Sequence, residues 1–143
     1  MSPSIVEQIM SIDSRFRMIN ISNHGYGYAI NTGIKYSIGK YIGIVESDDW
    51  IEDNMYEVLF NETKKVKGGV DIVKSGFFKH FNDKTSILKP IRDGFNYYGK
   101  IMEPVKSPNK ISSLVVNIWS SIYRRDFLID KNVLCNETPN AAF

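Results

Sequence analysis

The chain has 143 residues, of which 43% are hydrophobic and 24% are charged, and its formal net charge is +2. This length and composition predict one soluble globular domain, or part of one, and exclude a disordered chain. The charge is too balanced to indicate nucleic acid or an anionic membrane as the main partner, so we expect no nucleic-acid partner. The single cysteine, Cys135, excludes an internal disulfide and favours the reducing cytoplasm.

The first third of the chain alternates between helix and strand patterns. Isoleucines one turn apart predict a short helix over Ser4–Ile12, and Met18–Ser22 alternates like a strand. A turn-rich loop follows at Asn23–Gly27, and the spacing of apolar residues predicts a helix over Tyr28–Ile38. The continuous apolar run Tyr41–Val45 is typical of a strand buried on both faces of a parallel sheet.

The remaining elements continue this alternation. We expect a helix from about Asn54, a strand over Val70–Phe77 and a strand pair within Phe78–Ile91. Arg92–Asn109 is predicted to be a loop and Leu114–Tyr123 a helix. The order predicts an α/β fold with a mostly parallel sheet flanked by helices, and a right-handed crossover that joins the first two strands.

Polar loops follow the first two predicted strands. Parallel strands would bring the glycine-rich loop Asn23–Gly27 and the acids Glu46, Asp48 and Asp49 to one sheet edge, where ligands of open α/β sheets bind. The glycines let a ligand approach the backbone, and the next helix offers free N–H groups to phosphate. The clustered carboxylates suit Mg²⁺ or Mn²⁺ bridging a diphosphate. The alternative is that Asp48, Asp49, Glu52 and Asp53 only cap the following helix and favour its dipole.

The most specific pattern is the run NHGYGYAINTGIKYSIGKYIGIVESDDWIEDNMYEVLF. It resembles family 2 glycosyltransferases of the GT-A fold, and the matching positions are Asn23, Gly25, Asn31, Gly33, Gly39, Tyr41, Ile42, Ser47, Asp48, Asp49 and Trp50. The later run IWSSIYRRDFLIDKNVLCNETP is similar to the acceptor-side segment of bacterial members. The resemblance implies one partial GT-A-like (Rossmann-like) domain, with residues 1–77 on the donor and metal side and 78–143 on the acceptor side.

The resemblance also implies a reaction and its residues. The reaction would be an inverting, metal-dependent transfer of a sugar from a nucleotide-diphosphate sugar, with a UDP-sugar expected, to a hydroxyl of a glycan or lipid-linked acceptor. The donor would be bound by Asn23, Gly25, Asn31, Glu46, Asp48 and Asp49. Asp48 and Glu46 would hold Mn²⁺ or Mg²⁺. Trp50 and Trp119 would lie on the acceptor side, although either could instead be a core side chain.

Two positions depart from the family pattern. Ile30 stands where an arginine is usual, and Glu46 replaces the first aspartate of the D-x-D pattern. The resemblance also begins after the family's first strand–helix–strand unit and stops before its catalytic-base aspartate, which we expect beyond Phe143. We therefore expect a fragment that is incomplete at both ends and inactive alone. The alternative is a non-catalytic binding or assembly module derived from such an enzyme.

Partners and location follow from the same reasoning. A fragment without its first strands would expose a sheet edge, which invites pairing with a second copy of the chain. No stretch approaches the roughly 20 apolar residues that span a bilayer. The expected location is the cytoplasm, either free or held peripherally at the inner face of the membrane by a lipid-linked acceptor.

Overall fold

The computed structural model describes residues 2–81, 84–88, 99–109 and 117–138. The chain divides into two compact units. The helical unit comprises Met1–Gly33 with Cys135–Ala142, and the sheet unit comprises Ile34–Leu134 with Phe143.

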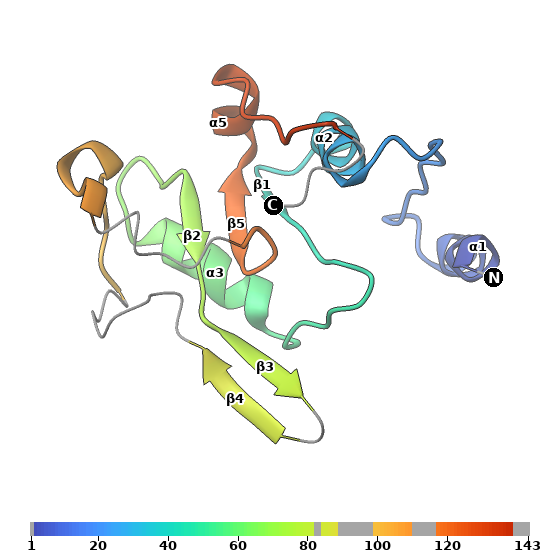
Figure 1. The fold of residues 1–143 in the computed structure, drawn as a ribbon, viewed down its shortest axis with the longest axis horizontal. Coiled ribbons are helices and arrows are strands. Elements are labelled where there is room, and N and C mark those ends of the chain that lie inside the picture. The colour runs from blue at the N-terminus through green and yellow to red at the C-terminus, as the bar shows by residue number, and fades with distance from the viewer. Residues whose placement is uncertain (1, 82–83, 89–98, 110–116, 139–143) are drawn as a thin grey trace. The chain divides into compact units, whose positions relative to one another are not determined.

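The helical unit contains α1 (Ser2–Ile12) and most of α2 (Tyr26–Tyr36), whose last three residues belong to the sheet unit (Figure 1). Both helices confirm predictions from apolar spacing, which is a local signal. The predicted bounds were Ser4–Ile12 and Tyr28–Ile38, so each helix begins two residues earlier than expected.

The strand predicted over Met18–Ser22 is wrong. These residues form neither helix nor strand, and no strand described in the structure pairs with them. Ile19 and Ile21 are 42% and 41% exposed, so the alternating pattern has no sheet face to bury. A strand needs both that face and a partner for its backbone groups. The expected crossover from this strand to Tyr41–Val45 therefore does not form.

The sheet unit holds the remaining elements. In chain order they are β1 (Tyr41–Gly43), α3 (Met55–Lys64), β2 (Ile72–Lys74), β3 (Phe77–Phe81), β4 (Lys84–Leu88), the 3-10 helix η1 (Pro104–Lys106), β5 (Ser121–Arg124) and α5 (Arg125–Asp130). The predicted strand, helix, strand and strand pair between residues 41 and 88 are confirmed. Residues 89–98 of the predicted strand pair and loop lie outside the described part of the chain. Among the described residues, no helix has the length and apolar character to cross a bilayer.

A three-stranded sheet of order β1-β5-β2 forms the centre of this unit. β5 pairs antiparallel with both neighbours, and one row of the sheet contains Gly43, Ile122 and Val73. β1 and β2 therefore run in the same direction, with β5 inserted between them. The prediction of a mostly parallel sheet is wrong for these pairings, while the alternation of strand and helix is confirmed in β1, α3 and β2.

The helix predicted over Leu114–Tyr123 is also wrong where the structure describes it. Residues 117–120 form a turn, and β5 begins at Ser121. Short apolar runs fit a buried strand as well as a helix. Here the flanking strands supply hydrogen-bond partners on both sides, and Ser121 and Ile122 are only 1% and 4% exposed.

The core of the sheet unit lies between α3 and the sheet, which pack together (Figure 1). Leu59 of α3, Ile42 of β1 and Ile122 of β5 are buried. Burying each such side chain contributes about 1.5–3 kcal/mol before entropy is counted. This packing fixes the point at which β1 ends and its following loop begins.

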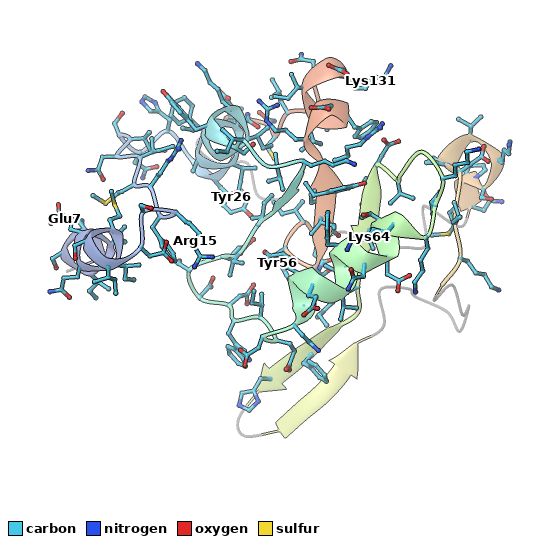
Figure 2. All side chains as sticks on the ribbon, turned by 180° about the vertical axis from the view of Figure 1, so that it is seen from behind. Glu7, Arg15, Tyr26, Tyr56, Lys64 and Lys131 are labelled. Carbon is cyan, nitrogen blue, oxygen red and sulfur yellow. The ribbon has the colours of Figure 1, made fainter. Side chains whose placement is uncertain are left out.

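Tyr56 of α3, labelled in Figure 2, lies over Gly43 of β1. A Cβ at Gly43 would come within 2.6 Å of Tyr56 Cζ. We expect Gly43→Ala to lower the free energy of unfolding by about 1–3 kcal/mol in urea titrations, because the packed ring must shift. In a Tyr56→Ala background the same substitution should cost much less. If Gly43→Ala lowered the free energy of unfolding equally in both backgrounds, the result would contradict the contact between Gly43 and Tyr56.

Candidate functional site

Polar groups gather at the edge of the sheet where β1 and β2 end and β5 begins, called the carboxyl edge below. The antiparallel register of β5 brings these three strand ends to the same side. The loop after β1 carries Glu46, Asp48 and Asp49, β2 ends at Lys74, and the turn Asn117–Ser120 precedes β5. The carboxyl end of a strand is where open α/β sheets bind ligands.

The acidic loop concentrates negative charge. The backbone amide of Asp49 donates to the carbonyl oxygen of Glu46 at 3.2 Å, which closes a tight turn. Burial, and then the neighbouring charges of Asp48 and Glu46, raise the pKa of the Asp49 carboxyl above its ordinary value. These are the conditions under which a divalent cation would offset like-charge repulsion.

Helix capping does not account for Asp48 and Asp49. α3 begins at Met55 with Asn54 as its N-cap residue, and Asn54 makes no side-chain capping hydrogen bond. The helix dipole acts within about the first turn. Asp48 and Asp49 stand outside that turn, so the alternative interpretation of these two residues is not supported.

The acidic loop can supply part of a metal site. Within the described ranges, no three His, Cys, Asp or Glu side chains are placed to hold a metal ion together. Mg²⁺ needs only one or two protein carboxylates when water and substrate phosphate complete its shell. Asp48 and Glu46 offer hard oxygen ligands of that kind, and metal binding at this loop stays a prediction.

Lys74 is a second polar feature of the carboxyl edge, and sequence reasoning missed it. Its Nζ donates to Asn117 O at 2.9 Å, to Asn117 Oδ1 and to Ser120 Oγ at 3.0 Å. Burial lowers the pKa of Lys74 to about 8. The three bonds tie the end of β2 to the turn before β5, and no motif in the sequence signals this pairing.

The two tryptophans have different surroundings. Trp50 is 71% exposed and meets His80 of β3 edge to face, with ring centroids 5.8 Å apart. Trp119 packs edge to face on Phe77 at 4.7 Å. Trp50 is therefore not a core side chain, whereas Trp119 is held by another aromatic ring. Their acceptor-side role stays a prediction.

The glycine-rich loop of the helical unit leads into α2. Asn23 Oδ1 accepts a hydrogen bond from the Gly25 amide at 3.0 Å, and Gly25 has a φ of 93°. Few residues other than glycine adopt that conformation. The loop thus ends in a tight turn one residue before the helix begins.

Asn31 of α2 is 8% exposed and binds the segment Cys135–Thr138. Its Nδ2 donates to Cys135 O at 3.0 Å and to Glu137 Oε1 at 2.7 Å, and its Oδ1 accepts from the Cys135 amide at 2.9 Å. The side chain therefore uses both its donor and its acceptor within the chain. The predicted donor-binding residues fall into two groups: Asn23, Gly25 and Asn31 belong to the helical unit, and the acidic loop belongs to the sheet unit.

Comparison with known proteins adds a family match. The profile described as glycosyl transferase family 2 matches residues 2–130. The chain is 31% identical over 138 residues to the uncharacterized glycosyltransferase EpsJ of Bacillus subtilis, covering 95% of this chain and 39% of EpsJ. It is 28% identical over 130 residues to the glycosyltransferase GlyA of Streptococcus pneumoniae, covering 86% of this chain and 18% of GlyA.

A third relative carries a more specific name. The chain is 26% identical over 140 residues to a cholesterol galactosyltransferase of Borreliella burgdorferi, covering 92% of this chain and 38% of that protein. The chain thus spans less than two fifths of the length of each of these three relatives.

Proposed function

Because this chain belongs to glycosyltransferase family 2, we propose that it supplies donor-binding and metal-binding parts of an enzyme that transfers a sugar from a nucleotide-diphosphate sugar to a glycan or lipid-linked acceptor. The observation that carries this proposal is the acidic loop at the carboxyl end of β1. It holds Glu46, Asp48 and Asp49 within four residues, in a tight turn that the Asp49 amide closes on the carbonyl oxygen of Glu46 at 3.2 Å.

In the proposed mechanism, the loop binds the diphosphate end of a UDP-sugar. Asp48 and Glu46 would hold Mn²⁺ or Mg²⁺, and Asp49 would support them. The metal would stabilise the negative charge of the departing diphosphate. The acceptor oxygen would attack the anomeric carbon as the bond to diphosphate breaks, with inversion, and its proton would pass to a base. One relative is named for galactose transfer, so UDP-galactose is the first donor to test.

A nucleotide-sugar donor also fits the proposed location. Such an enzyme would work in the cytoplasm, and a lipid-linked acceptor would hold it at the inner face of the membrane. Among the strands that the structure describes, β1 pairs with β5 alone, so its other side would be available to another strand, from this protein or from a second copy.

Ile30 favours a second candidate function. It stands at a position where the family resemblance predicts an arginine, which would offer a cation to the diphosphate. A chain without that cation could act as a binding or assembly module that holds a nucleotide sugar without transferring it. Nucleotide binding without turnover in the full-length protein would support this candidate.

The proposed site predicts that UDP binding depends on metal. In calorimetric titrations, UDP should bind in the presence of Mn²⁺ and give little heat without it. Asp48→Asn should weaken binding at least tenfold, which corresponds to about 1.4 kcal/mol, because it removes a charged metal ligand. Asp53→Asn, an exposed acid beyond the loop, serves as the matched control and should bind as the unmodified chain does. Equal heats without Mn²⁺, or full affinity in Asp48→Asn, would refute the site.

A further inference from the structure

Apolar side chains are left in solvent at the amino edge of the sheet, which is the edge where β1 and β2 begin and β5 ends. Tyr36 and Ile38 precede β1 and are 59% and 80% exposed, and Ile129 of α5 is 46% exposed. Burying side chains of this size would stabilise the fold, so their exposure gives up a favourable term. Exposed apolar side chains that cluster indicate an interaction surface, whereas single ones do not.

Hydrogen bonds bring the two segments together. The backbone amide of Arg125 donates to Lys40 O at 2.9 Å, and Arg125 Nε donates to Ser37 O at 2.8 Å. The connection before β1 therefore lies against the start of α5, at the end of β5 (Figure 1). Ile129 follows Arg125 by four residues, which places both on the same side of the helix. α5 has six residues, so its end lies only about 9 Å from its start.

Lysines accompany these apolar side chains. Lys35 and Lys40 flank the stretch that holds Tyr36 and Ile38, and Lys131, labelled in Figure 2, directly follows α5. All three lysines are exposed, and within the described ranges no carboxylate forms an ion pair with them. The amino-edge patch is defined by Lys35, Tyr36, Ile38, Lys40, Ile129 and Lys131.

The other described charges of this edge largely cancel. Arg124 pairs with Asp71, and Arg125 Nη1 lies 3.7 Å from Asp126 Oδ1. Asp130 is a further exposed carboxylate of α5. Set against it, the three lysines leave the patch with a surplus of positive charge, although the whole chain carries a net charge of only +2.

We propose that the amino-edge patch docks on the surface of an anionic lipid bilayer. The apolar side chains enter the interfacial layer of the lipids, where tyrosine is favoured, and the lysines reach the anionic headgroups. A second copy of the chain fits the patch less well, because a symmetric contact would set the same three lysines against one another.

This lipid surface goes beyond the proposed function, in which a lipid-linked acceptor holds the enzyme at the membrane. The patch binds the bilayer without any acceptor. It lies at the edge opposite the acidic loop, so a docked sheet unit turns that loop away from the lipid, toward glycan chains that extend from the surface.

Vesicle flotation tests the proposal. The chain is mixed with vesicles of phosphatidylcholine alone, or of equal parts phosphatidylcholine and phosphatidylglycerol, neither of which carries a lipid-linked sugar. We expect binding to the anionic vesicles only, and weaker binding as NaCl is raised. The triple variant Lys35→Gln/Lys40→Gln/Lys131→Gln should lose about fivefold in affinity for each lysine removed.

Matched controls separate the patch from general charge and apolarity. The variant Lys64→Gln/Lys65→Gln/Lys67→Gln removes the same charge from exposed positions at and after the end of α3, and should bind as the unmodified chain does. Ile38→Ser should weaken binding about tenfold. Val105→Ser should leave it unchanged, although Val105 of η1 is 94% exposed. All of these side chains are exposed, so the variants should stay folded.

Three results of the flotation assay would overturn the proposal: no binding to anionic vesicles, equal binding to neutral vesicles, or an equal loss in the two triple variants. The last would assign the attraction to the net charge of the chain. Light scattering without vesicles tests the other occupant. A dimer that dissociates in Ile38→Ser would assign the patch to a second copy and overturn the lipid surface.

UDP titrations with Mn²⁺ on the same variants keep this proposal separate from the nucleotide site. Each patch variant should bind UDP as the unmodified chain does, because the acidic loop lies at the opposite edge. Vesicle binding without UDP binding would refute only the nucleotide site. UDP binding without vesicle binding would refute only the lipid surface.

Discussion

Gly27→Ala is expected to detach the segment Cys135–Thr138 from α2. A Cβ at Gly27 would overlap the backbone oxygen of Asn136 and lie 2.7 Å from its carbonyl carbon. Backbone atoms cannot turn aside as a flexible side chain can, so the segment must move. That movement would break the hydrogen bonds from Asn31 to Cys135. Overpacking of this kind costs about 1–3 kcal/mol, and the buried amide left unpaired adds a similar amount.

Gly33→Ala is the matched control for that prediction. Gly33 lies in the same helix, and a Cβ there would meet nothing within 4 Å. Because glycine destabilises a helix interior, Gly33→Ala should raise the free energy of unfolding by about 0.5–1 kcal/mol.

Cys135 provides the readout, since it is the single thiol and is only partly exposed. Burial raises the pKa of this thiol, which keeps it slow to react. Maleimide labelling should therefore become much faster in Gly27→Ala and stay unchanged in Gly33→Ala. Asn31→Ala should also speed labelling, by removing the bonds rather than adding a clash. Equal labelling rates in all four chains would show that the segment is not held by α2.

The attachment of this segment bears on how the sequence motif around Asn31 is interpreted. The resemblance places Asn31 in the donor pocket, and in the structure its amide holds Cys135 and Glu137. Its contribution to donor binding stays a prediction. A residue that fixes neighbouring backbone can shape a pocket without touching the ligand. A loss of activity in Asn31→Ala must therefore be compared with the rate of Cys135 labelling, which shows whether the segment Cys135–Thr138 has been released.

Local signals predicted the local features of this fold. Apolar spacing identified α1 and α2, and the run Tyr41–Val45 identified β1. The acidic loop could be placed for the same reason, because it directly follows an apolar strand. Each of these inferences needs only residues that are neighbours in sequence.

Pairings between distant segments could not be predicted in the same way. β5 lies between β1 and β2, although it follows β2 by more than 40 residues in the chain. Its short apolar run carries no sign of strand direction, so the antiparallel insertion was missed. Met18–Ser22 shows the opposite failure, since its alternation is strand-like but its backbone finds no described strand to pair with.

The hydrogen bonds of Lys74 could not be predicted from the sequence either, because its partners Asn117 and Ser120 lie 43 and 46 residues away. Lys74→Met keeps the length of the side chain but leaves the carbonyl oxygen of Asn117 without this donor. We expect it to lower the free energy of unfolding by roughly 1–3 kcal/mol at pH 7, as measured in urea.

The effect of Lys74→Met should also depend on pH. Burial lowers the pKa of Lys74 to about 8 from an ordinary 10.5. Between these values the unfolded chain holds a proton that the folded chain has lost, so the contribution of Lys74 to stability rises with pH. The stability difference between the unmodified chain and Lys74→Met should therefore widen from pH 8 to pH 10. Lys74→Arg keeps a permanent charge and should lose this pH dependence while restoring part of the hydrogen bonding. A stability difference that stays constant or narrows above pH 8 would mean that the Lys74 ammonium is not held at the half-buried end of β2. The link between β2 and the turn before β5 would then have to come from Ser75, whose hydroxyl donates to Ser120 O at 3.0 Å.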